Sequence, residues 1–169
     1  MTLASPARHT SWMLNLSNRF AVIGLGNTLR RDDGIGILIL ESLRSFYKRD
    51  GVDYLNFGIA SFDLLHRMKE YDKILLIDGI DASLKPTEAK IFGLEEIAFS
   101  AKRLPGSSHE LNLKNIFDLY KKLDINTKIY VAGIQVMDSS FGEGISEILK
   151  KNLDKTIKEI NLFIDENLV

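Results

Sequence analysis

The sequence predicts an α/β fold, namely a three-layer α/β/α sandwich with a mostly parallel, twisted sheet of about five strands. Short apolar runs that favour β-strands alternate along the chain with amphipathic stretches of helical period. This alternation is typical of βαβ units, whose helices cover both faces of a parallel sheet. The length of 169 residues suits one such domain with a substantial core.

Strands and helices are expected to alternate from residue 20 onward. The expected strands are residues 20–23, 52–57, 74–77, 90–94 and 128–132, and the expected helices are residues 35–48, 62–68, 109–120 and 145–164. The run 74–77 is the most apolar, which indicates a central parallel strand. The run 90–94 follows a short turn that contains Pro86, so this strand can be antiparallel to its neighbour. We expect residues 1–18 to be an N-terminal extension and residues 19–169 to be a single domain.

Composition excludes several classes of function. The chain has no cysteine, which excludes disulfides, a thiol nucleophile and thiolate metal sites, and leaves His, Asp and Glu as metal ligands. A formal net charge of −1 gives no broad basic surface for nucleic acid. No apolar run approaches the roughly 20 residues that cross a bilayer. These features are consistent with a cytoplasmic protein that is not inserted in a membrane.

The stretch 20–36, FAVIGLGNTLRRDDGIG, joins the first strand to the first helix. Three interpretations of it remain open. A dinucleotide site would use Gly24 and Gly26, but Leu29 stands where a third glycine belongs, and Asp32 and Asp33 would repel a pyrophosphate. Alternatively, an aspartate of the pair caps the helix, or one caps it while the other binds a metal.

Two further residues could share a metal site with Asp33. Asp78 directly follows the most apolar strand, where a carboxylate needs a metal, a cap or a hydrogen-bonded turn to offset its burial. His109 opens a helix after an irregular segment, and Leu113 excludes the H-E-x-x-H zinc motif there. Carboxylates after neighbouring parallel strands lie on one sheet edge, so these residues could converge as an oxygen and nitrogen site for a borderline divalent ion.

The chain resembles the hydrogenase maturation endopeptidases, which remove a short C-terminal tail from the large subunit of NiFe-hydrogenases after nickel insertion. The resemblance rests on the motif GLGNTLRRDDGIG (24–36), on Leu76-Ile77-Asp78 and on Ser108-His109-Glu110-Leu111, in the family's order and spacing. It covers roughly residues 20–162 and implies a five-stranded sheet between helices, of the phosphorylase/hydrolase-like kind.

By position, the resemblance implies that Asp33, Asp78 and His109 are the metal ligands and the catalytic residues. It also implies an endopeptidase whose nickel is carried by the substrate, a hydrogenase large-subunit precursor, with another divalent ion as a substitute. Asp32 and Glu110 remain candidates for a general base by proximity. The alternatives are a non-enzymatic module that senses nickel or a partner, a nucleotide-binding protein, and a different metallopeptidase.

The chain departs from the family after its second strand. Many members have an Asp-Gly-Gly-Thr-x-Gly segment there, whereas this chain reads NFGIAS at 56–61, and only Gly58 is kept. We expect this change to alter the wall of the cleft or the approach of the substrate.

Overall fold

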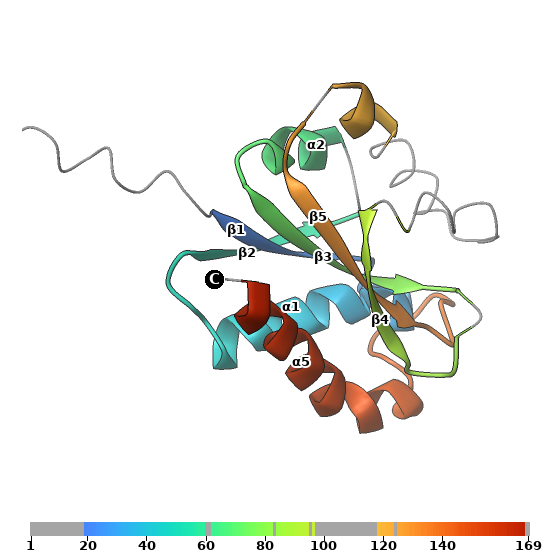
Figure 1. Ribbon diagram of the computed structural model, residues 1–169. Coiled ribbons are helices and arrows are strands. Elements are labelled where there is room, and N and C mark those ends of the chain that lie inside the picture. Colours follow the sequence, from blue (N-terminus) through green and yellow to red (C-terminus); the bar gives the residue numbers. More distant parts are fainter. Residues whose placement is uncertain are drawn as a thin grey trace, which may run out of the picture.

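The computed structural model describes residues 19–59, 62–82, 84–94, 96, 118–123 and 125–167 (Figure 1). The strands are β1 (Phe20–Leu25), β2 (Val52–Gly58), β3 (Lys73–Ile80), β4 (Ala89–Gly93) and β5 (Lys128–Gln135). The helices are α1 (Ile35–Phe46), α2 (Phe62–Met68) and α5 (Glu147–Asn167), and a short 3-10 helix, η1 (Arg31–Gly34), precedes α1. The predicted α/β fold is confirmed.

The five strands form one sheet in the order β2-β1-β3-β5-β4. The first four strands in this order are parallel to their neighbours, and β4 is antiparallel to β5. Strand β3 lies in the middle, as the apolar run 74–77 predicts. Strand β4 is the antiparallel edge strand that the short preceding turn made possible.

Helices lie on both faces of the sheet, which gives the expected three layers (Figure 1). Helices α1 and α5 pack on one face with alternate strand residues such as Val22, Leu75 and Ile77. Helix α2 packs on the other face with the intervening residues, such as Ile23 and Leu76. Among the described residues, no helix is both long enough and apolar enough to cross a membrane.

Predicted strand ends fall short at the carboxyl edge of the sheet, where β1 continues beyond residue 23 to Leu25 and β2 continues beyond residue 57 to Gly58. Strand β3 continues beyond Ile77 to Ile80, and β5 continues beyond Ala132 to Gln135, because these extensions pair with each other through Ile80 and Gln135. Asp78 therefore lies within a strand rather than after one. The last helix begins at Glu147, two residues later than expected.

Some predictions concern residues outside those described. Residues 1–18 and the first part of the helix expected at 109–120, including His109 and Glu110, fall there. Residues 118–122, which are described, are helical.

Candidate functional site

Two glycines allow the loop after β1 to pack tightly on the ends of β1 and β3. Gly26 has a φ of 129°, and a Cβ atom there would lie 1.9 Å from the carbonyl oxygen of Asp33. A Cβ atom on Gly36 would lie 2.2 Å from the carbonyl oxygen of Ile77 and 2.4 Å from that of Leu25. Only glycine fits these positions, so the motif 24–36 brings η1 directly against the carboxyl ends of the two strands.

Asp32 is fully buried and joins η1 to the loop that follows β5. Its Oδ2 atom accepts hydrogen bonds from the backbone N–H groups of Met137 (3.1 Å) and Asp138 (3.0 Å) and from the hydroxyl of Ser146 (3.0 Å). Its Oδ1 atom accepts a bond of 2.6 Å from the N–H of Ser146. In return, the N–H of Asp32 donates to the carbonyl oxygen of Asp138. The Asp32 carboxylate is thus occupied in holding two loops together.

The alternative in which Asp32 or Asp33 caps the helix is wrong. Helix α1 is preceded by Gly34 at its N-cap, and no side chain makes a capping hydrogen bond there. The 3-10 helix starts after Arg30, also without a side-chain cap. Both aspartates belong to η1, and Gly34 stands between Asp33 and the first residue of α1. Instead, the Asp32 carboxylate accepts backbone N–H groups from the loop after β5, and the Asp33 carboxylate accepts the N–H of Asn27 in its own loop.

Asp33 is buried, and its carboxylate is hydrogen-bonded to the start of the loop that follows β1. Only 7% of its surface is exposed, and its Oδ2 atom accepts a hydrogen bond of 3.0 Å from the N–H of Asn27. The side chain of Asn27 in turn accepts a bond from the N–H of Leu29. These bonds fix Asp33 at the base of the loop after β1.

Asp78 lies where β3 extends past β1. The pairing of β1 with β3 ends at Gly24 and Ile77, whereas on the other side Asp78 pairs with Gly133 of β5. Side chains alternate between the faces of a strand, so Asp78 points to the same face as Leu76, the face that α2 covers. Only 4% of its surface is exposed.

Asp33 and Asp78 therefore belong to adjacent strand ends at one edge of the sheet. Strand β3 packs against η1 and the start of α1 here, because a Cβ atom on Gly79 would lie 3.3 Å from the carbonyl oxygen of Asp32 and 3.2 Å from the Ile35 side chain. Two carboxylates supply oxygen donors to a divalent ion, and an imidazole would add nitrogen. Among the described residues no three His, Cys, Asp or Glu side chains form a metal cluster. The third predicted ligand, His109, lies outside these residues.

The divergent segment begins at this same edge. The N–H of Gly26 donates to the carbonyl oxygen of Gly58 at 2.8 Å, and the N–H of Gly58 donates to the side chain of Asn56 at 3.0 Å. The end of β2 is therefore tied directly to the loop after β1. The described part of the segment, residues 56–59, thus begins beside the predicted site rather than far from it.

Sequence reasoning did not find Ser146 or Gln135, which both organise this edge. The buried Gln135 side chain accepts N–H groups from Ala82 and Leu84 and donates to the carboxylate of Asp81. Asp81 is thereby assigned to a turn. Most of the donors to Asp32 and to Gln135 are backbone N–H groups, which have no signature in the sequence.

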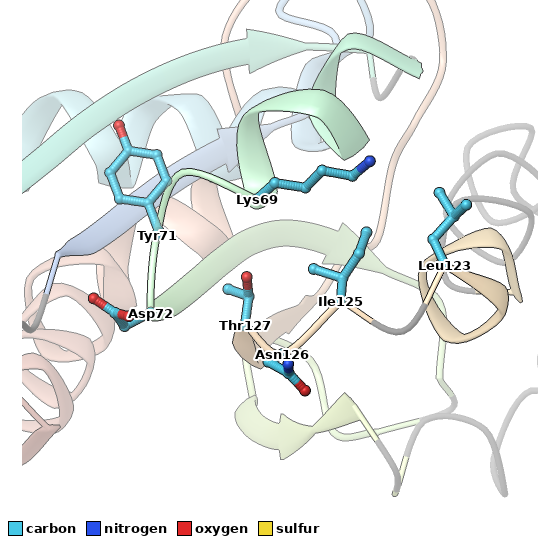
Figure 2. Close-up of a pocket in the computed structure, with 7 residues that line it drawn as sticks. All are labelled: Lys69, Tyr71, Asp72, Leu123, Ile125, Asn126 and Thr127. Carbon is cyan, nitrogen blue, oxygen red and sulfur yellow. The ribbon is translucent and has the colours of Figure 1, made fainter.

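A pocket of about 370 Å³ lies elsewhere in the fold (Figure 2). It is lined by Lys69, Tyr71, Asp72, Leu123, Ile125, Asn126 and Thr127. These residues precede β3 and β5, so the pocket lies at the amino edge of the sheet, opposite to Asp78. It contains none of the predicted site residues.

Several solved structures that share this fold are described as hydrogenase maturation peptidases. The hydrogenase maturating endopeptidase HybD from Escherichia coli superposes with a TM-score of 0.79 and 24% identity, covering 88% of this chain and 93% of that one. The NiFe hydrogenase maturation protease HybD from Thermococcus kodakarensis gives a TM-score of 0.71 at 27% identity, covering 86% of this chain and 98% of that one.

Sequence comparison identifies the family. The family model described as HycI, hydrogenase maturation protease, matches residues 37–162, and the chain belongs to this family. The hydrogenase 2 maturation protease of E. coli is 33% identical over 102 residues, which cover 58% of this chain and 60% of that relative. The hydrogenase expression/formation protein HupM of Azotobacter chroococcum is 24% identical over 159 residues, which cover 91% of this chain and 75% of that relative.

Proposed function

We propose that this protein is a cytoplasmic endopeptidase that removes the C-terminal tail of a NiFe-hydrogenase large-subunit precursor after nickel insertion. The observation that carries the proposal is the placement of two buried carboxylates, Asp33 and Asp78, at one sheet edge in a chain of the maturation protease family. In this proposal they bind the nickel that the precursor carries, together with His109.

The donor set suits such a role. Carboxylate oxygens and one imidazole nitrogen match a borderline divalent ion, and the chain has no thiolate that would favour a closed zinc site. A ligand set of three residues leaves coordination positions for the precursor's own groups. Recognition would thus depend on nickel already held by the substrate, which makes cleavage a check on nickel insertion. Another divalent ion could replace nickel at these three ligands.

Peptide-bond cleavage in this proposal uses a carbonyl polarised by the metal or a water activated by it. Asp32 is a poor candidate for the general base. A base must reach the proton that it removes, whereas the Asp32 carboxylate is fully buried and holds the N–H groups of Met137, Asp138 and Ser146. We therefore propose a structural role for Asp32.

A nucleotide-binding function receives no support from the glycine loop. A pyrophosphate is bound where a backbone leaves space beside its glycines and where N–H groups point outward. Here the space against Gly26 is filled by the carbonyl of Asp33, and the N–H of Gly26 is bonded to Gly58.

The test is incubation with a large-subunit precursor prepared with and without nickel, with tail removal read by mass spectrometry. We expect cleavage of the nickel-loaded precursor alone. Asp33→Asn, Asp78→Asn and His109→Ala should each abolish cleavage, whereas Asp154→Asn, which alters an exposed carboxylate on α5, should not.

Three results would contradict the proposal or a part of it. If a nickel-free precursor were cleaved at the same rate, the protein would not recognise nickel in its substrate. Binding of the precursor without cleavage by the wild-type protein would favour the sensing module instead. Full activity of His109→Ala would exclude that residue as a ligand.

A further inference from the structure

Three large apolar side chains are exposed on two paired loops beside the candidate site. We call Leu29, Met137 and Phe141 the apolar platform; their exposed fractions are 50%, 55% and 81%. The loops that carry them are bonded to each other, because the N–H of Gly142 donates to the carbonyl oxygen of Leu29 and the N–H of Arg31 donates to that of Gly142, both at 2.9 Å. Phe141 and Leu29 are thus brought together from opposite ends of the chain.

The platform has a fixed backbone. The N–H of Met137 is bonded to the carboxylate of Asp32, the Arg30 side chain donates to the carbonyl oxygen of Ser139 at 3.1 Å, and Arg31 pairs with Asp138 at 3.4 Å. Single exposed apolar residues are common on protein surfaces, whereas apolar side chains gathered on one ordered surface are candidates for a partner contact.

The platform is continuous with the candidate site. Leu29 lies in the same loop as Asp33, whose carboxylate accepts the N–H of Asn27 in that loop. Met137 is bonded to Asp32, the residue before Asp33. A chain whose tail reaches Asp33 would therefore place its adjoining surface over Leu29, Met137 and Phe141.

The size of the platform favours a transient partner. Three side chains of this kind present a few hundred Å² at most, since even one aromatic side chain buries only about 150–250 Å². A stable interface buries roughly 1,200–2,000 Å² in total. A second copy of this chain would need a much larger surface, whereas an enzyme holds its protein substrate only during turnover.

We propose that the apolar platform docks an apolar surface of the folded large-subunit precursor, next to the tail that is cleaved. This inference rests on the proposed function and extends it, because it assigns recognition of the precursor's body to residues outside the metal ligands. Docking here would contribute to substrate binding and not to the chemical step, so it should affect KM and leave kcat unchanged.

The test compares Phe141→Ser, and the double variant Phe141→Ser/Met137→Ser, with a matched control. The control is Phe46→Ser, since Phe46 is 80% exposed, as much as Phe141, but lies at the other end of α1, at the amino edge of the sheet. KM and kcat for tail removal are measured on the nickel-loaded precursor. We expect KM to rise about tenfold for the double variant, with kcat unchanged, and neither to change for the control.

Binding is measured separately from cleavage. The Kd of the precursor is determined for the Asp78→Asn background with and without Phe141→Ser/Met137→Ser, and we expect the double platform substitution to weaken binding about tenfold there as well. Urea unfolding and light scattering of each variant show whether its fold and its oligomeric state are unchanged.

Distinct results overturn the inference and the proposed function. Equal KM values for the platform variants and for Phe46→Ser, with an active wild type, would exclude the platform as the docking surface and leave the proposed function intact. A wild-type protein that neither binds nor cleaves the precursor would overturn both. A dimer that Phe141→Ser converts to a monomer without a change in KM would assign the platform to a second copy of this chain.

Discussion

Ser146 and Asp32, 114 residues apart in the chain, are joined by two hydrogen bonds in the folded protein. The backbone N–H of Ser146 donates to Oδ1 of Asp32 at 2.6 Å, and its hydroxyl donates to Oδ2 at 3.0 Å. Ser146 directly precedes α5, so one buried carboxylate connects the glycine loop with the start of the last helix. Substitution of Asp32 tests how much this connection stabilises the fold.

Asp32→Ala should strongly destabilise the protein. The substitution leaves the N–H groups of Met137, Asp138 and Ser146, which are partly buried, without their acceptor. An unsatisfied donor of this kind costs about 1–3 kcal/mol. We therefore expect the free energy of unfolding to fall by about 2 to 4 kcal/mol or more. Urea denaturation measures it, with the exposed Asp154→Ala as a control that should change stability by no more than about 0.5 kcal/mol. An equally small effect of Asp32→Ala would show that the carboxylate is not a structural clamp.

Gly36→Ala should be far more harmful than Gly93→Ala. A methyl group on Gly36 would lie 2.2 Å and 2.4 Å from two strand carbonyl oxygens, and neither backbone can move without disturbing the sheet. Overpacking of this kind typically costs about 1–3 kcal/mol, and contact with backbone favours the upper end. A Cβ atom on Gly93 would meet only the Glu96 side chain, at 3.6 Å. Thermal unfolding of the two variants should therefore give clearly different Tm values; similar values would argue against the tight packing of α1 on β1 and β3.

Arg49→Lys should weaken the contact that joins helix α5 to the segment following α1. The guanidinium donates to the side chains of Asp165 and Asn161, each at 2.7 Å, and to the carbonyl oxygen of Tyr47 at 2.8 Å. A lysine ammonium cannot reproduce this fork, so we expect a loss of about 1–2 kcal/mol in unfolding free energy. Arg44→Lys, which alters an exposed pair with Glu41, is the matched control and should be nearly neutral. Equal urea midpoints for the two variants would contradict this assignment.

The loop that carries the platform should lose stability at acid pH. Hydrogen bonds from the hydroxyl and the backbone N–H of Ser140, with Arg31 nearby, hold the pKa of Asp138 below its ordinary value. A carboxyl whose pKa is lowered by folding stabilises the fold above its unfolded pKa and loses that contribution as the pH falls through the folded pKa. The stability deficit of Asp138→Asn relative to wild type should therefore shrink as the pH is lowered from 7 toward 3. Ser140→Ala should show part of the same trend, and a deficit that is constant with pH would contradict it.

Most of the fold could be predicted because strand runs and helical stripes are properties of local sequence. The run 74–77 is apolar throughout because both faces of β3 are covered by helices. The extension of β3 to Ile80 could not be predicted in this way. It depends on pairing with β5, more than 50 residues later, and Asp78 and Gly79 do not favour a strand by themselves.

The candidate site could be predicted in part. Two carboxylates at the carboxyl edge follow from parallel topology, and both Asp33 and Asp78 lie there. The separate roles of Asp32 and Asp33 could not be predicted, because adjacent aspartates before a helix look alike in sequence. Only the fold shows that Asp32 accepts N–H groups from the loop after β5, whereas Asp33 closes its own turn. The role of His109 stays a prediction.

The hydrogen bonds that Met137, Asp138 and Ser146 donate to Asp32 have a consequence for synthesis on the ribosome. The donors to Asp32 among the described residues lie between 137 and 146, so a nascent chain carries the charged side chain of Asp32 long before any of them exists. A buried carboxylate without donors is unfavourable, so these hydrogen bonds can stabilise the glycine loop on β1 and β3 only after residue 146 has emerged. We therefore expect this loop to reach its final structure only when translation of the domain is nearly complete.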